Sequence, residues 1–172
     1  MLAIATFDIG TTAVKAVLVD ETGTVLASAS QDIPTLFQNG RKEQDPNVWW
    51  EAFRDLSQVL FTHYDTRDIA GIVMSGQMQD VIPVDESLAP LGNAILYADG
   101  RGAEEAKKLN ALLGPEKIAA ITGNAMDGTL SLPKILWLRE HEPDIFTQAK
   151  CFLISSKDYV NARLTGICAS DV

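Results

Sequence analysis

Three short polar segments of the 172-residue chain combine residue types that can bind phosphate, metal or a polyhydroxylated ligand. The first starts at Asp8 and continues into the turn Gly10-Thr11-Thr12, with Lys15 three residues beyond. A carboxylate at a strand end can hold a hydrated Mg²⁺ while backbone N–H groups face a phosphate. Phosphoryl transfer needs this combination, because its catalysis is mostly positioning and charge neutralisation. The same residues are also typical of a plain β-turn, and neither G-x-x-x-x-G-K nor G-x-G-x-x-G is present.

The second segment covers residues 75–80 and follows directly after an apolar run. Gly76 allows the chain to bend sharply there. Gln77, Gln79 and Asp80 then offer amides and a carboxylate, which are groups that bind hydroxyls. A polar loop that only connects two strands is the other interpretation of this segment.

The third segment covers residues 97–101 and comes just before an expected helix. Asp99 can accept hydrogen bonds from two adjacent sugar hydroxyls, with Arg101 fixing the carboxylate and Tyr97 at the strand end. A helix cap with a surface ion pair explains the same residues equally well.

The expected elements place each polar segment at the end of a short strand. Apolar and β-branched runs predict strands at residues 2–9, 13–19, 25–30, 69–74, 81–84 and 151–154, with a further short run at 91–97. Helical spacing predicts a helix from Pro46 to about Phe61, capped by Asp45, and others at 103–113, 116–121, 131–141, 142–149 and 156–164. Residues 33–44 are polar and are expected to be irregular. This is an α/β or α+β domain, in which the three segments should converge at one edge of a sheet.

Composition and charge restrict the partners. The chain is 47% apolar and carries 14 Lys plus Arg against 23 Asp plus Glu, a net charge of −9 without a basic block. Nucleic acid and anionic membrane surfaces are therefore not expected as partners. Cys151 and Cys168 have no Cys or His at a metal-binding spacing, which argues against zinc and a disulfide framework. The opening residues lack a basic leader and no apolar stretch approaches about 18 residues, so a cytoplasmic protein without a membrane span is expected.

Several other polar and aromatic residues are expected to have no chemical role. His63 and His141 lie at helix ends and should be surface residues without a partner. The acid pairs Asp85-Glu86 and Glu104-Glu105 are typical of solvated faces. Packing is the expected role of the tryptophans, which are Trp49, Trp50 and Trp137.

The order of these motifs resembles the N-terminal part of the FGGY carbohydrate kinase family, and within it the xylulokinases. The matching segments are collinear over nearly the whole chain, so their joint match is specific although each one is short. They are Asp8-Ile9-Gly10-Thr11-Thr12 with Lys15, Glu43-Gln44-Asp45-Pro46 before Trp49-Trp50, Ser75-Gly76-Gln77-Met78, Tyr97-Ala98-Asp99-Gly100-Arg101, Ile121-Thr122-Gly123-Asn124, Pro133-Lys134 before Leu136-Trp137-Leu138, and Lys157-Asp158-Tyr159 before Arg163-Leu164-Thr165-Gly166.

This resemblance implies an actin-like, ribonuclease H-like α/β lobe, the first of two, with ATP and Mg²⁺ in the cleft and a sugar as phosphoryl acceptor. It places Asp8 at the phosphates and at the metal, which the carboxylate reaches through water. It assigns the transferring end of ATP to Gly10, Thr11, Thr12 and Lys15. On the sugar side it implies a second set of residues: Gln77, Met78, Gln79, Tyr97, Asp99 and Arg101.

Three residues at two places depart from the xylulokinase pattern. Gln79-Asp80 stands where His-Gly is usual, and Tyr97 stands where Trp is usual. Gln79 keeps hydrogen bonding but cannot titrate near neutral pH, and Tyr97 keeps an aromatic wall with an added hydroxyl. A ketopentose such as xylulose is the expected substrate, with another ketose, a polyol or a modified sugar as alternatives.

The resemblance also implies that residues 1–172 form only part of the first lobe. In the family, the aspartate that acts as general base lies beyond the matching region, and the second lobe carries the adenine site. This chain alone is therefore expected to be inactive as a kinase, and its uncovered face is expected to favour self-association. The other hypotheses are a non-catalytic sugar-binding module and a glycerol-type kinase, although the Gln77-Met78-Gln79 segment lacks the Arg-Glu pair of the latter.

Overall fold

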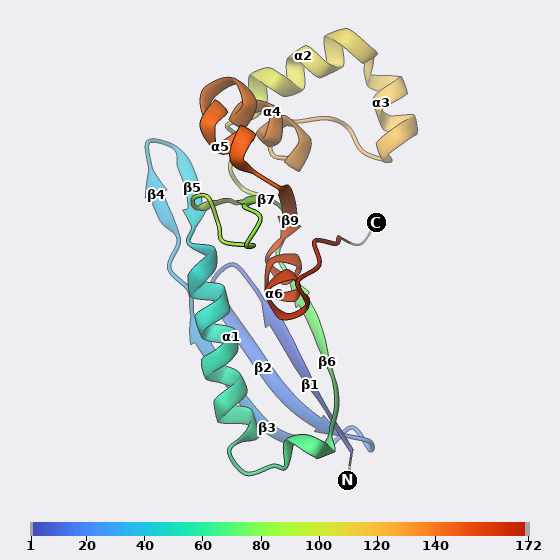
Figure 1. Ribbon diagram of the computed structural model, residues 1–172. Helices are drawn as coiled ribbons and strands as arrows, with labels where there is room; N and C mark the ends of the chain where they lie inside the picture. The colour runs from blue at the N-terminus through green and yellow to red at the C-terminus, as the bar shows by residue number, and fades with distance from the viewer. Residues whose placement is uncertain (1, 171–172) are drawn as a thin grey trace.

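Two β-sheets form the framework of the computed structural model, which describes residues 2–170 (Figure 1). The expectations that concern residues 1, 171 and 172 lie outside the described residues. The first sheet has the strand order β3-β2-β1-β6, in which β1 is antiparallel to β2 and parallel to β6. Its strands are β1 (Ala3–Ile9), β2 (Ala13–Asp20), β3 (Val25–Asp32) and β6 (Ile69–Gly76).

The second sheet is smaller and has the order β4-β5-β8-β7-β9. Its strands are β4 (Leu36–Gln38), β5 (Arg41–Gln44), β7 (Met78–Val84), β8 (Ala94–Ile95) and β9 (Cys151–Ser155). The helices are α1 (Pro46–Phe61), α2 (Ala103–Leu113), α3 (Pro115–Thr122), α4 (Ser131–His141), α5 (Pro143–Gln148) and α6 (Ser156–Thr165), with a 3₁₀ turn at Thr66–Asp68. The expected mixed α/β class is confirmed.

The alternation of β1 decides which side chains face the core and which face outward. Ala3, Ala5, Phe7 and Ile9 are buried, whereas the intervening side chains point to the other face. Successive side chains of a strand point to opposite faces, so Asp8 must lie on the outer face once Phe7 and Ile9 are buried. The packing of Phe7 and Ile9 in the core therefore makes the Asp8 carboxylate face outward.

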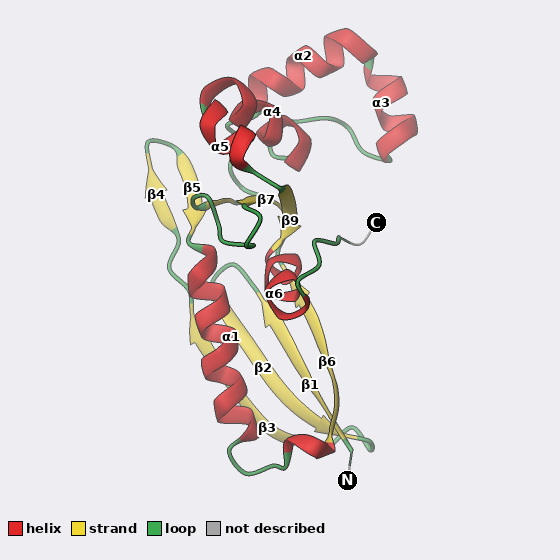
Figure 2. Ribbon diagram, viewed as in Figure 1, coloured by secondary structure: helices red, strands yellow, loops and turns green. Residues whose placement is uncertain are grey.

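Helices α1 and α6 cover the same face of the first sheet (Figure 2). Asp45 caps α1 by accepting a hydrogen bond from the backbone N–H of Asn47 at 2.9 Å, and Pro46 occupies the first turn, as predicted. The ring of Phe53 packs on Phe7 with a centroid distance of 4.6 Å. The buried stripe of α1 consists of Trp49, Ala52, Phe53, Leu56 and Leu60, and complete burial of such a large side chain typically contributes about 1.5–3 kcal/mol.

The expectation that residues 33–44 are irregular is wrong. The segment forms the β4–β5 hairpin, whose turn residues Asn39 and Gly40 have φ values of 53° and 79°. A two-residue turn with both φ values positive matches the right-handed twist of the flanking strands, and Asn-Gly is the pair that favours it.

The strand boundaries around the second polar segment also differ from the prediction. Strand β6 runs to Gly76 and β7 already starts at Met78, so only Gln77 lies between them. A Cβ atom at Gly76 would collide with Ser156 Oγ and stand 3.0 Å from the backbone nitrogen of Lys157, which shows how closely α6 approaches this bend. The predicted run at 91–97 contributes only the two residues of β8.

None of the helices within residues 2–170 is both long and apolar enough to span a lipid bilayer.

Candidate functional site

An open hollow of about 390 Å³ lies where the C-terminal ends of β1 and β6 meet the start of β7. It joins the first two polar segments with the first residue of the third. It does not include Thr12, Lys15, Asp99 or Arg101. The lining residues are Asp8, Gly10, Thr11, Gly76, Gln77, Met78, Gln79 and Tyr97.

Asp8 lies on the outer face of the first sheet between two polar neighbours. The parallel register pairs it with Ser75 on β6, whose hydroxyl donates a hydrogen bond of 2.8 Å to Asp8 Oδ1. The antiparallel register places Lys15 of β2 directly opposite. A carboxylate, a hydroxyl and an ammonium group are therefore presented side by side on one solvent-facing surface.

The turn after β1 leaves the approach to Asp8 open. Gly10 donates its backbone N–H to Ala13 O at 3.1 Å, which closes the turn. A Cβ atom at Gly10 would stand 3.1 Å from Ala13 O and 3.9 Å from Asp8 Oδ2, so a side chain would narrow the space beside the carboxylate. Carboxylate oxygens are suitable ligands for Mg²⁺, which usually keeps several of its bound water molecules. The residues present therefore fit a hydrated magnesium ion.

The buried side chain of Gln44 holds the glycine turn in place, a role that the sequence analysis missed. Its Nε2 donates to Thr11 O at 2.6 Å and to Thr35 Oγ1 at 2.9 Å. Its Oε1 accepts from Trp49 Nε1 at 3.0 Å and from Gln77 Nε2 at 2.8 Å. Both polar atoms of one amide are thus fully used, and they link α1, the turn and the β6–β7 bend.

The opposite wall of the hollow carries exposed side chains suited to a polyhydroxylated ligand. Met78 and Tyr97 are 51% and 42% exposed. Gln79 is also exposed, and its φ of 64° lies in the left-handed region, which is strained for a residue with a side chain. The Gln79 amide can both donate to and accept from hydroxyls.

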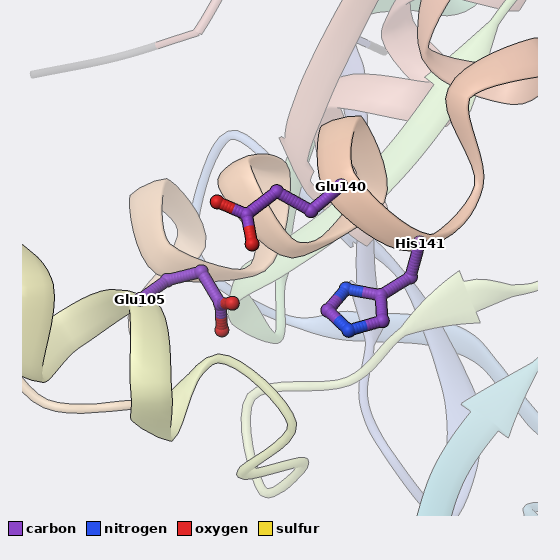
Figure 3. Close-up of side chains that lie close together, drawn as sticks. All are labelled: Glu105, Glu140 and His141. Carbon is purple, nitrogen blue, oxygen red and sulfur yellow. The ribbon is translucent and has the colours of Figure 1, made fainter.

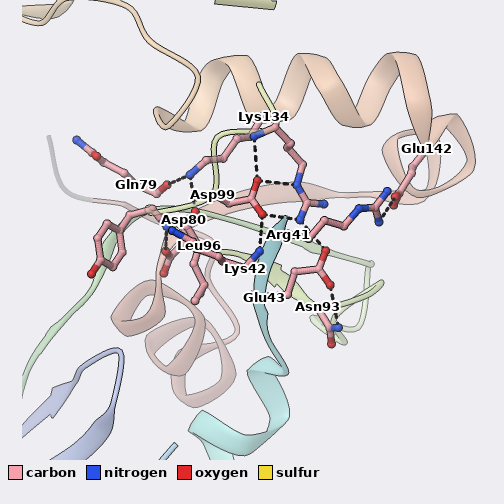
Figure 4. A network of polar contacts seen from close by, with 12 residues as sticks. Arg41, Lys42, Glu43, Gln79, Asp80, Asn93, Leu96, Asp99, Lys134 and Glu142 are labelled. Atoms are coloured by element: carbon pink, nitrogen blue, oxygen red, sulfur yellow. Dashed lines mark hydrogen bonds and ion pairs between the residues drawn. The ribbon is translucent and has the colours of Figure 1, made fainter. Parts of the chain in front are cut away.

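Two buried ionisable side chains, Lys134 and Asp80, hold the backbone of this wall (Figure 4). Lys134 Nζ donates to Gln79 O at 2.9 Å and to Leu96 O at 2.7 Å. Asp80 Oδ1 accepts the backbone N–H of Tyr97 at 2.9 Å. The strained Gln79 backbone and the Tyr97 backbone are consequently held by two side chains with no exposed surface.

Burial shifts the pKa values of Asp80 and Lys134 toward neutral pH. It raises the pKa of Asp80 to about 7, although the Tyr97 N–H and the charge of Lys134 act in the opposite direction. It lowers the pKa of Lys134 to about 8, against the charges of Asp80 and Asp99. Asp80 Oδ2 has no hydrogen-bond partner among the described residues.

The third polar segment forms a buried ion pair away from the hollow. Asp99 Oδ2 accepts from Lys42 N and Arg101 Nη2, both at 2.7 Å, and Oδ1 accepts from Arg101 N and Nε, both at 2.9 Å. Burial raises the pKa of Asp99, but the bonds from Arg101 and from Lys42 N–H outweigh this effect and leave it below its usual value. Arg101 also binds Glu43 at 2.7 Å. With both Asp99 oxygens doubly engaged, the geometry supports the ion-pair interpretation of this segment, although the pair is buried and not on the surface.

A family profile, individual relatives and solved structures all indicate similarity to carbohydrate kinases. The profile described as the FGGY family of carbohydrate kinases, N-terminal domain, matches residues 3–172. The xylulose kinase of Klebsiella pneumoniae is 38% identical over 169 residues, which cover 96% of this chain and 34% of that protein.

Two solved structures are similar over almost the whole chain. A xylulose kinase from Rhodospirillum rubrum has a TM-score of 0.91 and 33% identity, covering 98% of this chain and 35% of that one. A gluconate kinase from Lactobacillus acidophilus has a TM-score of 0.87 and 31% identity, covering 96% of this chain and 34% of that one. The chain therefore spans about a third of the length of the relatives it matches.

We expect Gln44→Met to destabilise the chain by about 2–4 kcal/mol, because the apolar side chain leaves buried partners such as Trp49 Nε1 and Gln77 Nε2 without a hydrogen bond. Urea unfolding followed by circular dichroism measures the change. Gln58→Met on the exposed side of α1 is the matched control and should change stability by less than about 0.5 kcal/mol. Equal effects of the two substitutions would contradict the proposed role of Gln44.

We expect Asp80→Asn to flatten the dependence of stability on pH. The carboxyl has an ordinary pKa of 3.8 and a folded-state pKa of about 7. Between these values the folded chain binds more protons than the unfolded chain, so the free energy of unfolding falls as pH rises from about 4 to 7. The asparagine variant lacks this fall and should exceed the wild-type chain in stability near pH 7 by on the order of 1–3 kcal/mol.

Urea unfolding at several pH values across this window tests that expectation. The control is Asp55→Asn on the exposed side of α1, which keeps the buried Asp80 carboxyl, so the fall in stability between about pH 4 and 7 should persist. An unaltered slope in Asp80→Asn would show that the buried carboxyl does not titrate in this range.

Proposed function

The chain belongs to the FGGY family of carbohydrate kinases, and we propose that it forms the N-terminal lobe of an enzyme that transfers a phosphoryl group from ATP to a sugar hydroxyl. The observation that carries this proposal is the composition of the hollow. It combines Asp8 and the Gly10-Thr11 turn on one side with Met78, Gln79 and Tyr97 on the other. A phosphate-binding side and a hydroxyl-binding side within one hollow suit phosphoryl transfer between two small ligands.

On the phosphate side, we propose that Asp8 binds Mg²⁺ through water while Gly10 and Thr11 contact the transferring end of ATP. Thr12 and Lys15 are proposed to contribute from the rim, since Lys15 lies opposite Asp8 in the sheet register. When bound, Mg²⁺ would neutralise phosphate charge. The protein's own contribution is to orient the phosphates by a turn that Gln44 holds rigidly.

On the sugar side, we propose that Met78, Gln79 and Tyr97 contact the substrate, and that Gln77 positions the bend between β6 and β7. A ketopentose such as xylulose is the first candidate, because the Klebsiella and Rhodospirillum relatives are xylulose kinases. The Lactobacillus relative is a gluconate kinase, so the substrate test has to include other polyhydroxylated compounds. Asp99 and Arg101 are left out of this proposed contact set, since both Asp99 oxygens and Arg101 Nε and Nη2 are already engaged with each other, with Lys42 N–H or with Glu43.

Two further proposals concern the cellular location of the lobe and its self-association. We propose a cytoplasmic location, where ATP and unphosphorylated sugars are available. We also propose that the chain alone self-associates through the β6 side of the first sheet, where Ile72 and Val73 are 43% and 57% exposed.

Titration of the ¹⁵N-labelled chain with D-xylulose is expected to shift amide signals of Met78, Gln79 and Tyr97. Gln79→Ala should reduce these shifts because the sugar loses the side-chain amide. L-xylulose, gluconate and glycerol are the comparison ligands, and Gln58→Ala is the matched protein control. A folded spectrum that responds to none of these compounds would contradict sugar binding by the isolated lobe.

The isolated chain is expected to release ADP at the same slow rate with and without sugar. Asp8 is the one carboxylate among the described lining residues, and this proposal assigns it to the phosphate side, which leaves the sugar hydroxyl without a base. The hollow also lies open to water, and this favours neither phosphoryl transfer nor retention of the nucleotide. A coupled assay measures this rate, and sugar-dependent turnover within the range of about 1–100 s⁻¹ that is common for kinases would contradict the expectation.

A further inference from the structure

A second hollow, of about 340 Å³, lies between α2 and the C-terminal end of α4, and its lining is separate from that of the hollow around Asp8. Three potential metal ligands converge there, which are Glu105 from α2 and Glu140 and His141 from α4 (Figure 3). One ligand atom from each residue lies within 4.8 Å of the other two. The proposed kinase function uses none of these residues.

Glu105 is the most unusual member of this group. The sequence analysis expected Glu104-Glu105 to be a solvated face, but Glu105 is only 2% exposed because it faces α4. Its Oε2 atom is buried without a hydrogen-bond partner among the described residues, and Oε1 lies 3.6 Å from Lys108 Nζ. A buried carboxylate oxygen without a partner is costly, so this atom favours a cationic or hydrogen-bonding ligand.

The environment of His141 prepares its imidazole for metal binding. His141 is exposed, as predicted, but it has a partner, because Nδ1 lies 3.1 Å from Trp137 O and the ring stacks on Trp137 at 4.7 Å. A carbonyl oxygen can only accept, so the neutral ring carries its proton on Nδ1 and keeps a lone pair on Nε2. Metal-binding histidines are commonly oriented by such a bond from the other ring nitrogen.

Lys108 provides the counter-charge in the absence of an ion. Its ammonium lies 2.7 Å from Glu140 Oε2, and its side chain is 59% exposed. An exposed lysine can turn outward into water at little cost, which would release the Glu140 carboxylate. Arg101, which also lines this hollow, is fixed by its ion pairs with Asp99 and Glu43 and does not compete.

We propose that Glu105, Glu140 and His141 bind a divalent transition-metal ion, with Zn²⁺ as the best fit, and that the ion displaces the Lys108 ammonium. Imidazole together with carboxylates favours Zn²⁺ over Mg²⁺ or Ca²⁺. In a tetrahedral site, two zinc–ligand bonds of about 2.1 Å place their ligand atoms about 3.4 Å apart, so atoms that lie up to 4.8 Å apart must close by up to about 1.4 Å. The exposed ends of Glu140 and His141 can make that movement. Three protein ligands leave one position for water, and the bound ion would link α2 to α4.

Calorimetric titration of the chain with Zn²⁺ tests the site, in a Cys151→Ser, Cys168→Ser background so that thiols do not contribute. Saturable binding of one ion is expected. His141→Ala should weaken it by at least about tenfold, since even loss of an outer-shell partner costs about that much. His63→Ala is the matched control and should bind as before, because the chain has only these two histidines.

A second variant tests the displacement of the lysine. Lys108→Met removes the competing ammonium and should tighten Zn²⁺ binding several-fold, with circular dichroism confirming that each variant is folded. Unchanged or weaker binding by Lys108→Met would overturn the displacement. Absence of saturable binding, or equal effects of His141→Ala and His63→Ala, would overturn the site itself.

Discussion

The parallel pairing of β1 with β6 is the constraint on which the candidate active site depends. Because the two strands run in the same direction in register, their C-terminal ends reach one edge together. That pairing places Ser75 beside Asp8 and allows the backbone N–H of Gln77 to bond to Ile9 O at 3.1 Å. Ser156 at the start of α6 donates its hydroxyl to the same carbonyl at 2.7 Å. The turn at Gly10 and Thr11 and the bend between β6 and β7 are therefore attached to one backbone position.

Polar side chains in the interior do the remaining positioning, and Gln44 acts in a different way from Asp80 and Lys134. Gln44 is neutral and has every hydrogen bond satisfied, so it fixes the turn without an electrostatic penalty. Asp80 and Lys134 are charged groups whose burial favours their neutral forms, and one Asp80 oxygen lacks a partner. Burying two such groups costs free energy. Their value lies in the backbone geometry that they impose on Gln79 and Tyr97.

The sequence predicted the parts of this structure that local patterns determine. The strand that contains Asp8 and the Asp45-Pro46 start of α1 follow from short-range rules, and so does the presence of Asp8 and Gln79 at strand ends. The β4–β5 hairpin was missed although Asn39-Gly40 signals it, because the flanking residues are polar. The roles of Gln44 and Asp99 depend in part on distant partners, Thr11 at 33 positions and Lys42 at 57 positions, and the role of Glu105 depends on another helix. No periodicity in a single sequence reveals such pairings.

The two departures from the xylulokinase pattern form one physical unit. Asp80 replaces a glycine that has no side chain to offer, and its carboxylate binds the backbone of Tyr97, the other unusual residue, at 2.9 Å. Glycine at position 80 would leave the Tyr97 N–H without this acceptor, and it would remove a charge that faces Lys134. Lys134 in turn holds the carbonyl of Gln79, the residue that stands in place of histidine. Gln79, Asp80 and Tyr97 are therefore coupled through the hydrogen bonds of Asp80 and Lys134, and the shape of this wall of the hollow is a property of the three together.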